Sequence, residues 1–551
     1  MPLDEKADFV PIPYANDSLP SSPYSLPCSP YSATGLLHEY AEVKIPFHEQ
    51  ELSKRFGDYD RSETSGKISL VGIAATIVIG LVAVIIGIYI AVPRPNGMPG
   101  VVAVTITSTA APEVLGLIMA AVIVLCVEAI GFVHSVTLRA ALASESRLRF
   151  NNNLRLLTAS RRNPWLNPNG TFCNLLMIVL VTVSYAAGAV TLLHFTVDGE
   201  WVATHIYAVP VLLLGFSMLI QAGIALAGLR VTKVLTWSPS AFDTTAAMLY
   251  QSQVTRVPNR CMCSLLHEGS LGNAQAPNDR QPSPWQAHKS VRKVVVLLWV
   301  LILACILWGG VTYRLHDIYS AYYPQKTYSN SFAFFPNSQS KAYMFGPGTN
   351  IGPQTLAPMW VLSMVTLMVV QGVLSIGLHC SELIVNIVRD EVAWRKATTK
   401  VGTKPMRNPL VGSLGSSLNV ILIIAKSLLH WMFGFTLTFQ SAPCGPNDEE
   451  VCPQLSMYIV QIWYLAIALF VFAIGMTIVA NYRPKGPQPA AYGHIQTLAN
   501  LIDEWSTVMW WGHKADGLPY CHAGTSDERL PPVKMDCVYA GAASGAHKRV
   551  D

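Results

Sequence analysis

Eight long apolar stretches dominate this sequence, and each is long enough to cross a bilayer as an α-helix. A helix rises about 1.5 Å per residue, so about 20 apolar residues cover the roughly 30 Å of hydrocarbon in a membrane. The stretches lie at about 68–93, 112–136, 172–196, 205–229, 292–313, 358–386, 416–440 and 455–481. Only 13% of the residues are charged, and they fall almost entirely between these stretches. We therefore predict an all-α integral membrane protein, an eight-span helical bundle, rather than a set of soluble domains.

The distribution of basic residues predicts the orientation. With residues 1–67 in the cytoplasm, all but five of the 38 Lys and Arg residues fall in or beside cytoplasmic segments. The exceptions are Arg94, Arg314, Lys326, Lys341 and Lys426. Basic residues in short loops stay on the cytoplasmic side of a membrane, so we expect both termini to be cytoplasmic. Residues 1–67 are polar and rich in Pro and Ser, which predicts a disordered tail followed by an uncleaved signal-anchor. The expected location is a membrane of the secretory pathway, either the plasma membrane or an endomembrane.

An internal duplication is visible in the sequence. Residues 162–174 (RNPWLNPNGTFCN) align without a gap to 407–419 (RNPLVGSLGSSLN), at a separation of 245 residues. Upstream, Glu145 matches Glu391 with a one-residue shift, and downstream Pro239 matches Pro489. Each half then holds four spans, so both halves have the same orientation. We predict two parallel repeats, related by an axis along the membrane normal.

The repeats suggest boundaries for the chain. Residues 494–509 carry apolar side chains at helical spacing, and 241–254 is the expected counterpart in the first half. The predicted parts are a tail at 1–67, a first repeat with its trailing amphipathic helix at 68–254 and a cytoplasmic linker at 255–291. A second repeat with its own trailing helix follows at 292–511, and a C-terminal cytoplasmic tail at 512–551. We expect the second trailing helix to place Trp510 and Trp511 at headgroup level.

Two of the eleven cysteines, Cys444 and Cys452, share a short loop that we expect outside the cell or in a lumen. A close pair in an oxidising compartment favours a disulfide, with two free thiols as the alternative.

Polar and ionisable side chains inside spans 6 and 7 are the main candidates for a functional site. In span 6, His379, Glu382 and Asn386 recur on one helical face; in span 7, Lys426 and His430 share another. Their depths predict that Glu382 and Lys426 form an ion pair, with the two histidines one layer further in. Ionisable groups in a membrane are costly and often functional, but such a pair can also serve only to lock two helices in register.

The first half carries a different acid, Glu128, near the middle of span 2. The sequence offers no obvious partner for it, so a protonated carboxyl bonded to a neighbouring carbonyl is the simplest expectation. The span 3 residues that match Lys426 and His430 are Val181 and Tyr185, so the cluster is predicted from one half only.

No segment matches a phosphate-binding glycine loop, a zinc-protease motif or a nucleophile elbow. We therefore expect no enzyme of a kind that such motifs indicate, no cofactor and no nucleic-acid partner. An intramembrane enzyme of a new kind stays open; the lipid bilayer is an expected partner, and a small-molecule or ion ligand and protein partners are left open. Some cytoplasmic Cys and His residues are close in sequence but lack an established four-ligand spacing, so we predict no metal site. They are Cys261, Cys263, His267, Cys521 and His522.

Two stretches, 377–391 (GLHCSELIVNIVRDE) and 492–505 (YGHIQTLANLIDEW), resemble segments of uncharacterised multi-pass membrane proteins of filamentous fungi. The resemblance covers roughly span 5 to the C-terminal region. It implies a multi-pass membrane protein with no assigned activity, substrate or site residue, and it argues against a recognised transporter superfamily.

Two classes of function fit these features. One is a transporter or channel-like protein whose polar path lies near spans 2, 6 and 7. The other is a non-transporting membrane scaffold or sensor that acts through its cytoplasmic tails and loops. The first predicts a water-accessible polar pocket that opens to the cytoplasm, and the second predicts tightly packed spans with fully paired polar groups.

Overall fold

The computed structural model describes residues 61–93, 100–104, 111–197, 200–267, 274–322, 331–337, 339–345, 356–405, 408, 415–444 and 450–540. The predicted tail at 1–67 lies almost wholly outside the described residues. The side chains of 193–197, 200–203, 322, 345, 356–357, 359–360, 439–444 and 450–453 are not described.

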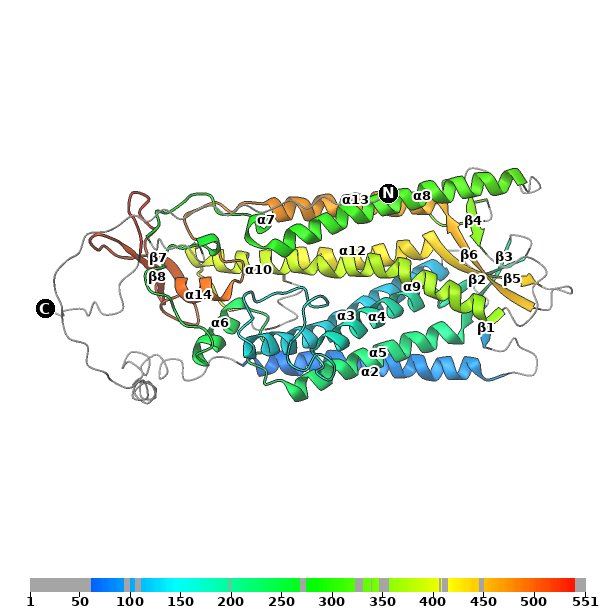
Figure 1. Ribbon diagram of the computed structural model, residues 1–551, viewed down its shortest axis with the longest axis horizontal. Helices are drawn as coiled ribbons and strands as arrows, with labels where there is room; N and C mark the ends of the chain where they lie inside the picture. The colour runs from blue at the N-terminus through cyan, green and yellow to red at the C-terminus, as the bar shows by residue number, and fades with distance from the viewer. Residues whose placement is uncertain are drawn as a thin grey trace, which may run out of the picture. The chain divides into compact units, whose positions relative to one another are not determined.

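Within these residues, eight helices are long and apolar enough to cross a membrane, which confirms the predicted number of spans. They are α2 (Glu63–Ala91), α3 (Ala111–Ser144), α4 (Thr171–Ala189), α5 (Ala208–Val231), α8 (Lys289–Tyr322), the pair α9 (Leu356–Cys380) and α10 (Glu382–Arg395), α12 (Ser417–Thr436) and α13 (Ile459–Asn481). In hydrocarbon, a helix satisfies its backbone hydrogen bonds internally, which explains why these apolar stretches fold as helices. Figure 1 shows them lying side by side.

The helices of the two halves make corresponding contacts. In the first half α2 packs against α5, and in the second α8 packs against α13. Between the halves, α3 packs against α12 and α4 packs against α9. Small residues allow close approach: a Cβ on Gly215 of α5 would lie 2.7 Å from the carbonyl oxygen of Gly80 of α2.

A β-sheet at one end of the spans was not predicted. Within the described residues it has six strands, in the order β1 (Val101–Val104), β3 (Glu200–Tyr207), β2 (Leu192–Val197), β5 (Leu437–Cys444), β6 (Glu450–Tyr458) and β4 (Ala342–Phe345). We call this the sheet end (Figure 1). Neighbouring strands are antiparallel except β2 and β5, which are parallel and pair His194 with Gln440 and Phe195 with Ser441. The prediction missed the sheet because its strands continue the apolar stretches of the adjoining helices.

The opposite end of the spans carries the short elements α6 (Ala241–Tyr250), α7 (Pro284–Ala287), α14 (Ile495–Leu501), β7 (Trp510–Ala515) and β8 (His522–Ser526). We call this group the end domain (Figure 1). Its core joins Phe242, Trp394, Leu498, Trp511 and Tyr539. The predicted counterparts at 241–254 and 494–509 both begin as helices, and α6 and α14 contact each other.

The second trailing helix is much shorter than predicted. It ends at Leu501 because the chain then turns to place the Asp503 carboxylate against the β7–β8 hairpin, where Asp503 accepts hydrogen bonds from Lys514 and from the backbone N–H of Thr525. Trp511 is 3% exposed in the core of the end domain, so its predicted position among lipid headgroups is wrong. The boundary predicted between 511 and 512 falls inside β7.

Hydrogen bonds join the two halves beside the end domain. Asp390 of α10 accepts hydrogen bonds from the side-chain amides of Asn151 (3.0 Å) and Asn152 (2.6 Å) in the segment between α3 and α4. Arg139 of α3 donates to Asn151 Oδ1 at 2.8 Å, and the N–H of Asn151 donates to the carbonyl of Gly493. These contacts fix the segment that follows α3 against the second half.

The structure does not support a disulfide between Cys444 and Cys452. The backbone register of the β5–β6 hairpin pairs Cys444 with Glu450 and Cys452 with Ala442, so the two cysteines do not face each other. Their side chains lie outside the described residues, and the described cysteine side chains contain no pair at disulfide distance.

Candidate functional site

Four ionisable side chains meet between the helices, and Lys426 lies at their centre. Its Nζ donates to Glu128 Oε1 at 2.6 Å and also to Glu382 Oε1. His379 Nδ1 lies 2.7 Å from Glu382 Oε1, 3.4 Å from Lys426 Nζ and 3.9 Å from Glu128 Oε1. The Lys426 side chain is 1% exposed, whereas Glu128 and Glu382 keep 29% and 20% exposure. We call these four residues the charge cluster.

Three helices supply the charge cluster. Glu128 comes from the middle of α3 and Lys426 from the middle of α12, while His379 and Glu382 flank Ser381, where α9 gives way to α10. Ser381 Oγ donates to the carbonyl of Gly377 at 3.0 Å. Bonds of this kind bend helices, and this one lies beside the residues that meet Lys426.

A second polar layer lies next to the charge cluster, formed by Tyr185 of α4, His430 of α12 and Gln371 of α9. The Tyr185 ring stacks on the His430 ring, with centroids 3.7 Å apart and planes 5° from parallel. Tyr185 Oη lies 3.3 Å from His379 Nε2, which connects this layer to the charge cluster. Gln371 Nε2 lies 2.7 Å from His430 Nδ1, while His430 Nε2 has no hydrogen-bond partner among the described residues.

The second layer borders a cavity of about 80 Å³ on the side of the sheet end. Its lining includes Tyr185 and His430 of the second layer together with Glu113, Trp431 and Tyr458. Part of the segment after α8 covers this region, because the Phe334 and Phe335 rings pack against Trp431 and Phe435. The cavity therefore lies between the second polar layer and the sheet end.

Arg155 approaches the charge cluster from the other side. It belongs to the segment between α3 and α4, is 8% exposed, and inserts its guanidinium against Gly131 of α3. A Cβ at Gly131 would lie 2.0 Å from Arg155 Nη1, so this position must be glycine for Arg155 to enter. Gly131 lies one helical turn along α3 from Glu128, towards the C-terminal end of that helix. Arg155 thus lies between the charge cluster and the end domain.

The structure brings together most of the residues that the sequence singled out. Glu382 and Lys426 form the predicted ion pair, with His379 beside them and His430 one layer further in. Asn386 lies on α10 one turn beyond Glu382 and takes no part in the described contacts of the cluster. Glu128 does not bond a carbonyl as expected but contacts Lys426 from the other half of the chain.

Three residues of the site were missed from sequence. Tyr185 and Gln371 are uncharged and look like ordinary span residues, and Arg155 lies outside the spans. A signal existed for Tyr185, because the predicted duplication aligns it with His430 at a separation of 245 residues.

The contacting groups of the charge cluster hold two carboxylates but a single ammonium. The nearby Arg155 guanidinium offsets part of this negative charge, and among the contacting groups the His379 imidazole is the one able to take a further proton. Glu128, His379 and Glu382 each have a ligand atom within 4.8 Å of the others, a spacing that could hold a metal ion. Lys426 Nζ, however, contacts all three and so supplies the positive charge itself. The chemistry that this arrangement allows is reversible proton binding.

Eight membrane-length apolar helices make this chain a multi-pass helical membrane protein. It matches no protein-family model, no curated protein and no solved structure.

Proposed function

We propose that the chain is a membrane transport protein, not an enzyme, and that the charge cluster carries protons as part of transport. The observation behind the proposal is the meeting of two carboxylates and one ammonium in a buried site between the two halves of the chain. Ionisable residues inside spans commonly serve as proton relays in transporters. The neighbouring hydroxyl and imidazole groups, from His379 through Tyr185 to His430 at the cavity, extend this polar route towards the sheet end.

The proposal includes an architecture of two parallel four-span repeats, and three observations support it. The strand order reads the same from both edges when β1, β3 and β2 are matched with β4, β6 and β5. The central strands are parallel, which a two-fold axis running along them requires. They pair residues 246 apart, close to the separations found in the sequence. Substrate and ion sites of repeat-built transporters lie near the repeat interface, where Glu128 meets Lys426.

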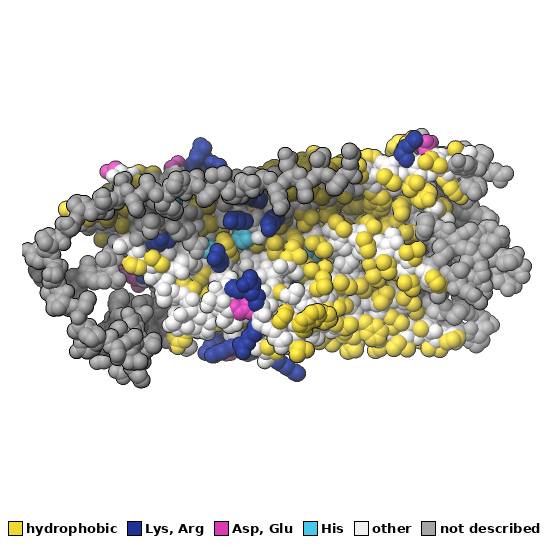
Figure 2. All heavy atoms as spheres, viewed as in Figure 1, with side chains coloured by type: hydrophobic (Ala, Val, Ile, Leu, Met, Phe, Trp, Pro, Cys, Tyr) yellow, Lys and Arg dark blue, Asp and Glu magenta, His cyan; other side chains and the backbone are white. Residues whose placement is uncertain are grey.

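The proposed orientation places the end domain in the cytoplasm and the sheet end outside the cell or in a lumen. Lys and Arg gather around the loops and the end domain in Figure 2, while the neighbouring span surface is largely apolar. Short loops rich in basic residues stay in the cytoplasm. Arg155 would then form an electrostatic barrier on the cytoplasmic side of the charge cluster, because a fixed positive charge repels protons and cations.

The test is proton movement through the purified full chain in liposomes that contain a pH-sensitive dye. An imposed pH gradient should collapse faster in wild-type vesicles than in protein-free vesicles, either alone or after addition of Na⁺, K⁺ or Ca²⁺. His379→Gln and Glu382→Gln should abolish the difference, whereas Asn386→Ala, on the same span but outside the cluster, should retain it. Wild-type vesicles that match protein-free vesicles under every condition would contradict the proposal.

The alternative function is that of a scaffold or sensor. The observation that favours it is the packed core of the end domain, because a folded domain outside the spans could bind a partner. The two functions make different demands on the charge cluster. A scaffold needs only that the charges are paired, so a folded variant with uncharged side chains would still work. A transporter with the same substitutions would be folded and inactive.

A further inference from the structure

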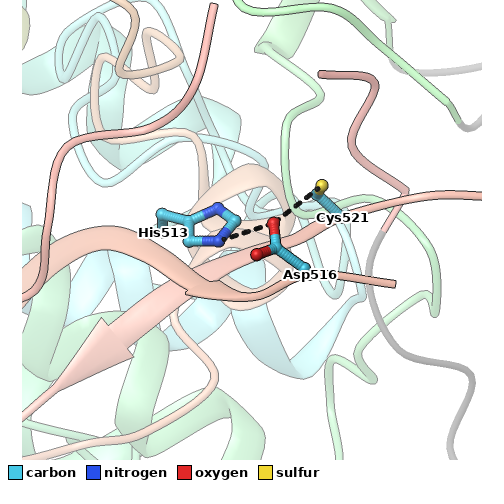
Figure 3. Close-up of side chains that lie close together, drawn as sticks. All are labelled: His513, Asp516 and Cys521. Atoms are coloured by element: carbon cyan, nitrogen blue, oxygen red, sulfur yellow. Dashed lines mark hydrogen bonds and ion pairs between the residues drawn. The ribbon is translucent and has the colours of Figure 1, made fainter. Parts of the chain in front are cut away.

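The end domain holds a second group of metal-binding side chains, which lies outside the membrane spans. His513 and Asp516 come from β7 and the turn after it, and Cys521 directly precedes β8 (Figure 3). Asp516 Oδ1 lies 3.2 Å from His513 Nε2 and 3.7 Å from Cys521 Sγ. One ligand atom from each residue lies within 4.8 Å of the other two. Cys537 is not part of this group of three, but the Cys521 thiol lies near enough to raise the pKa of the Cys537 thiol.

We propose that His513, Asp516 and Cys521 bind a structural Zn²⁺ ion and that the neighbouring Cys537 thiol moves in as the fourth ligand. One imidazole nitrogen, one carboxylate oxygen and two thiolates form a donor set that suits zinc in a tetrahedral site. With zinc bonds of about 2.0–2.3 Å, ligand atoms in a tetrahedron lie roughly 3.3–3.8 Å apart. The separations of 3.2 and 3.7 Å around Asp516 are already close to that geometry.

A neighbouring hydroxyl orients the histidine for this role. His513 Nδ1 lies 2.8 Å from the hydroxyl of Tyr539, a residue that is fully buried. With zinc bound, the Tyr539 oxygen would accept a hydrogen bond from Nδ1–H, which leaves Nε2, the nitrogen beside Asp516, unprotonated and able to bind the metal. Zinc-bound histidines usually have such a partner on their other nitrogen, because it fixes both the tautomer and the ring orientation.

Lys534 currently bonds both oxygens of Asp516, at 2.6 Å to Oδ1 and 2.7 Å to Oδ2. Zinc binding at Oδ1 requires that Lys534 keep only the bond to Oδ2. The lysine is 46% exposed and flexible enough for that movement. It would then neutralise part of the charge that two thiolates and a carboxylate bring to the ion.

A metal ion at this position would stabilise the C-terminal part of the end domain. Residues 510–540 contain one short hairpin and little other regular structure. Zinc would join β7, the turn and the strand-free segment around Cys537 into one unit, and a small unit of this kind gains much of its stability from such a link. The sequence did not predict the site because the spacing of the four residues follows no established zinc motif.

The test is metal analysis of the full chain purified under reducing conditions without chelator. We expect about one zinc per chain in the wild type and in Cys263→Ser, whose buried thiol lies outside the group. Cys521→Ser, Cys537→Ser and His513→Gln should lower the content several-fold. Because these variants could misfold, the wild type is also exchanged with Co²⁺, which should give the strong thiolate-to-cobalt absorption of a two-thiolate site. Wild-type protein without zinc and without cobalt absorption overturns the proposal, as does a Cys521–Cys537 disulfide trapped in freshly isolated membranes.

Discussion

Lys426 Nζ lies 2.6 Å from Glu128 Oε1, and this contact joins the lysine inside α12 of the second half to the acid at the middle of α3 in the first. The same ammonium also bonds Glu382, so one cation serves two carboxylates. The ratio of two carboxylates to one ammonium distinguishes the charge cluster from a simple ion pair. It also determines which substitution in the cluster should destabilise the protein most.

Lys426→Met should be the most damaging single substitution in the charge cluster, because it leaves two carboxylates without their cation. Removal of one partner from a buried pair costs about 3–5 kcal/mol. Glu128→Gln and Glu382→Gln should each cost less, about 1.5–3 kcal/mol, since one charged hydrogen bond is lost but a carboxylate–ammonium pair remains. The amount of monodisperse full-length protein recovered after solubilisation provides the measurement. Equal losses for all three variants would contradict the shared role of Lys426.

The triple variant Glu128→Gln, Glu382→Gln, Lys426→Met should recover much of the protein lost in Lys426→Met. The double variant Glu382→Gln, Lys426→Met should recover less, because Glu128 is then left without a cation. If the double variant yields as much folded protein as the triple variant, the contact between Glu128 and Lys426 does not contribute to stability.

Tyr185→Phe should distinguish the effect of the tyrosine hydroxyl on proton flux from the effect of its ring. The substitution keeps the ring that stacks on His430 but removes the hydroxyl that lies 3.3 Å from His379 Nε2. Loss of one hydrogen bond costs about 1 kcal/mol, so the variant should fold. Its proton flux in liposomes should nevertheless fall well below that of the wild type. A flux equal to the wild type would remove the hydroxyl from the route, and Tyr185→Leu shows the added effect of losing the ring.

Gly131→Ala should have the same consequence as Arg155→Ala. A methyl group at Gly131 would meet the Arg155 guanidinium at 2.0 Å, so the flexible arginine must withdraw from its position beside α3. Both variants should allow protons to reach the charge cluster more easily from the end-domain side. Dye-loaded liposomes of defined protein orientation measure this directly. Gly223→Ala, where a Cβ meets nothing within 4 Å, is the matched control.

Asp503 should stabilise the end domain in a pH-dependent way. Burial alone raises its pKa, but hydrogen bonds from His522 and Lys514 and the charge of Lys514 hold the pKa well below the ordinary value of 3.8. A carboxyl with a lowered pKa stabilises the fold fully above its unfolded pKa. The stabilisation is lost as the pH falls from about 4 towards the lower pKa of the folded state.

Asp503→Asn should therefore weaken the end domain at neutral pH and make its stability less sensitive to acid. Loss of the charged hydrogen bonds costs about 1.5–3 kcal/mol, which corresponds to roughly 10–150-fold faster opening. Hydrogen exchange of the backbone amides at 522–526 reports this change, and exposed Asp527→Asn should leave it unaffected. Unchanged exchange in Asp503→Asn would show that its ion pairs do not support the hairpin.

The spans could be predicted because their determinant is local. Twenty consecutive apolar residues have few alternatives to a membrane helix, and the pairing of Glu382 with Lys426 followed from their depths in adjacent antiparallel spans. The partner of Glu128 could not be found in this way, because sequence does not show which helices of the two halves are neighbours. The contact of α3 with α12 is a property of the packed bundle.

Other features depend on tertiary contacts that carry no sequence pattern. The strands of the sheet end have the same apolar composition as the helices they adjoin, so only their pairing distinguishes them. The trailing helix ends at Leu501 although apolar spacing continues to Met509. The chain leaves the helix there because Asp503 then accepts hydrogen bonds from Lys514 and from the backbone N–H of Thr525, which another helical turn would not allow. The zinc ligands come from separate turns of the chain and meet only after folding.

The protonation of the charge cluster is the most direct test of the account. The measurement is the ¹⁵N spectrum of His-labelled full chain in lipid between about pH 5 and pH 8, where an imidazole changes its charge. The His379 signal is assigned by its loss in His379→Gln. We predict that His379 gains a proton reversibly in the wild type, and that Glu382→Gln moves this change to lower pH because a contacting carboxylate is lost. A His379 that stays in one protonation state throughout, in folded wild-type protein, would contradict proton transfer at this site.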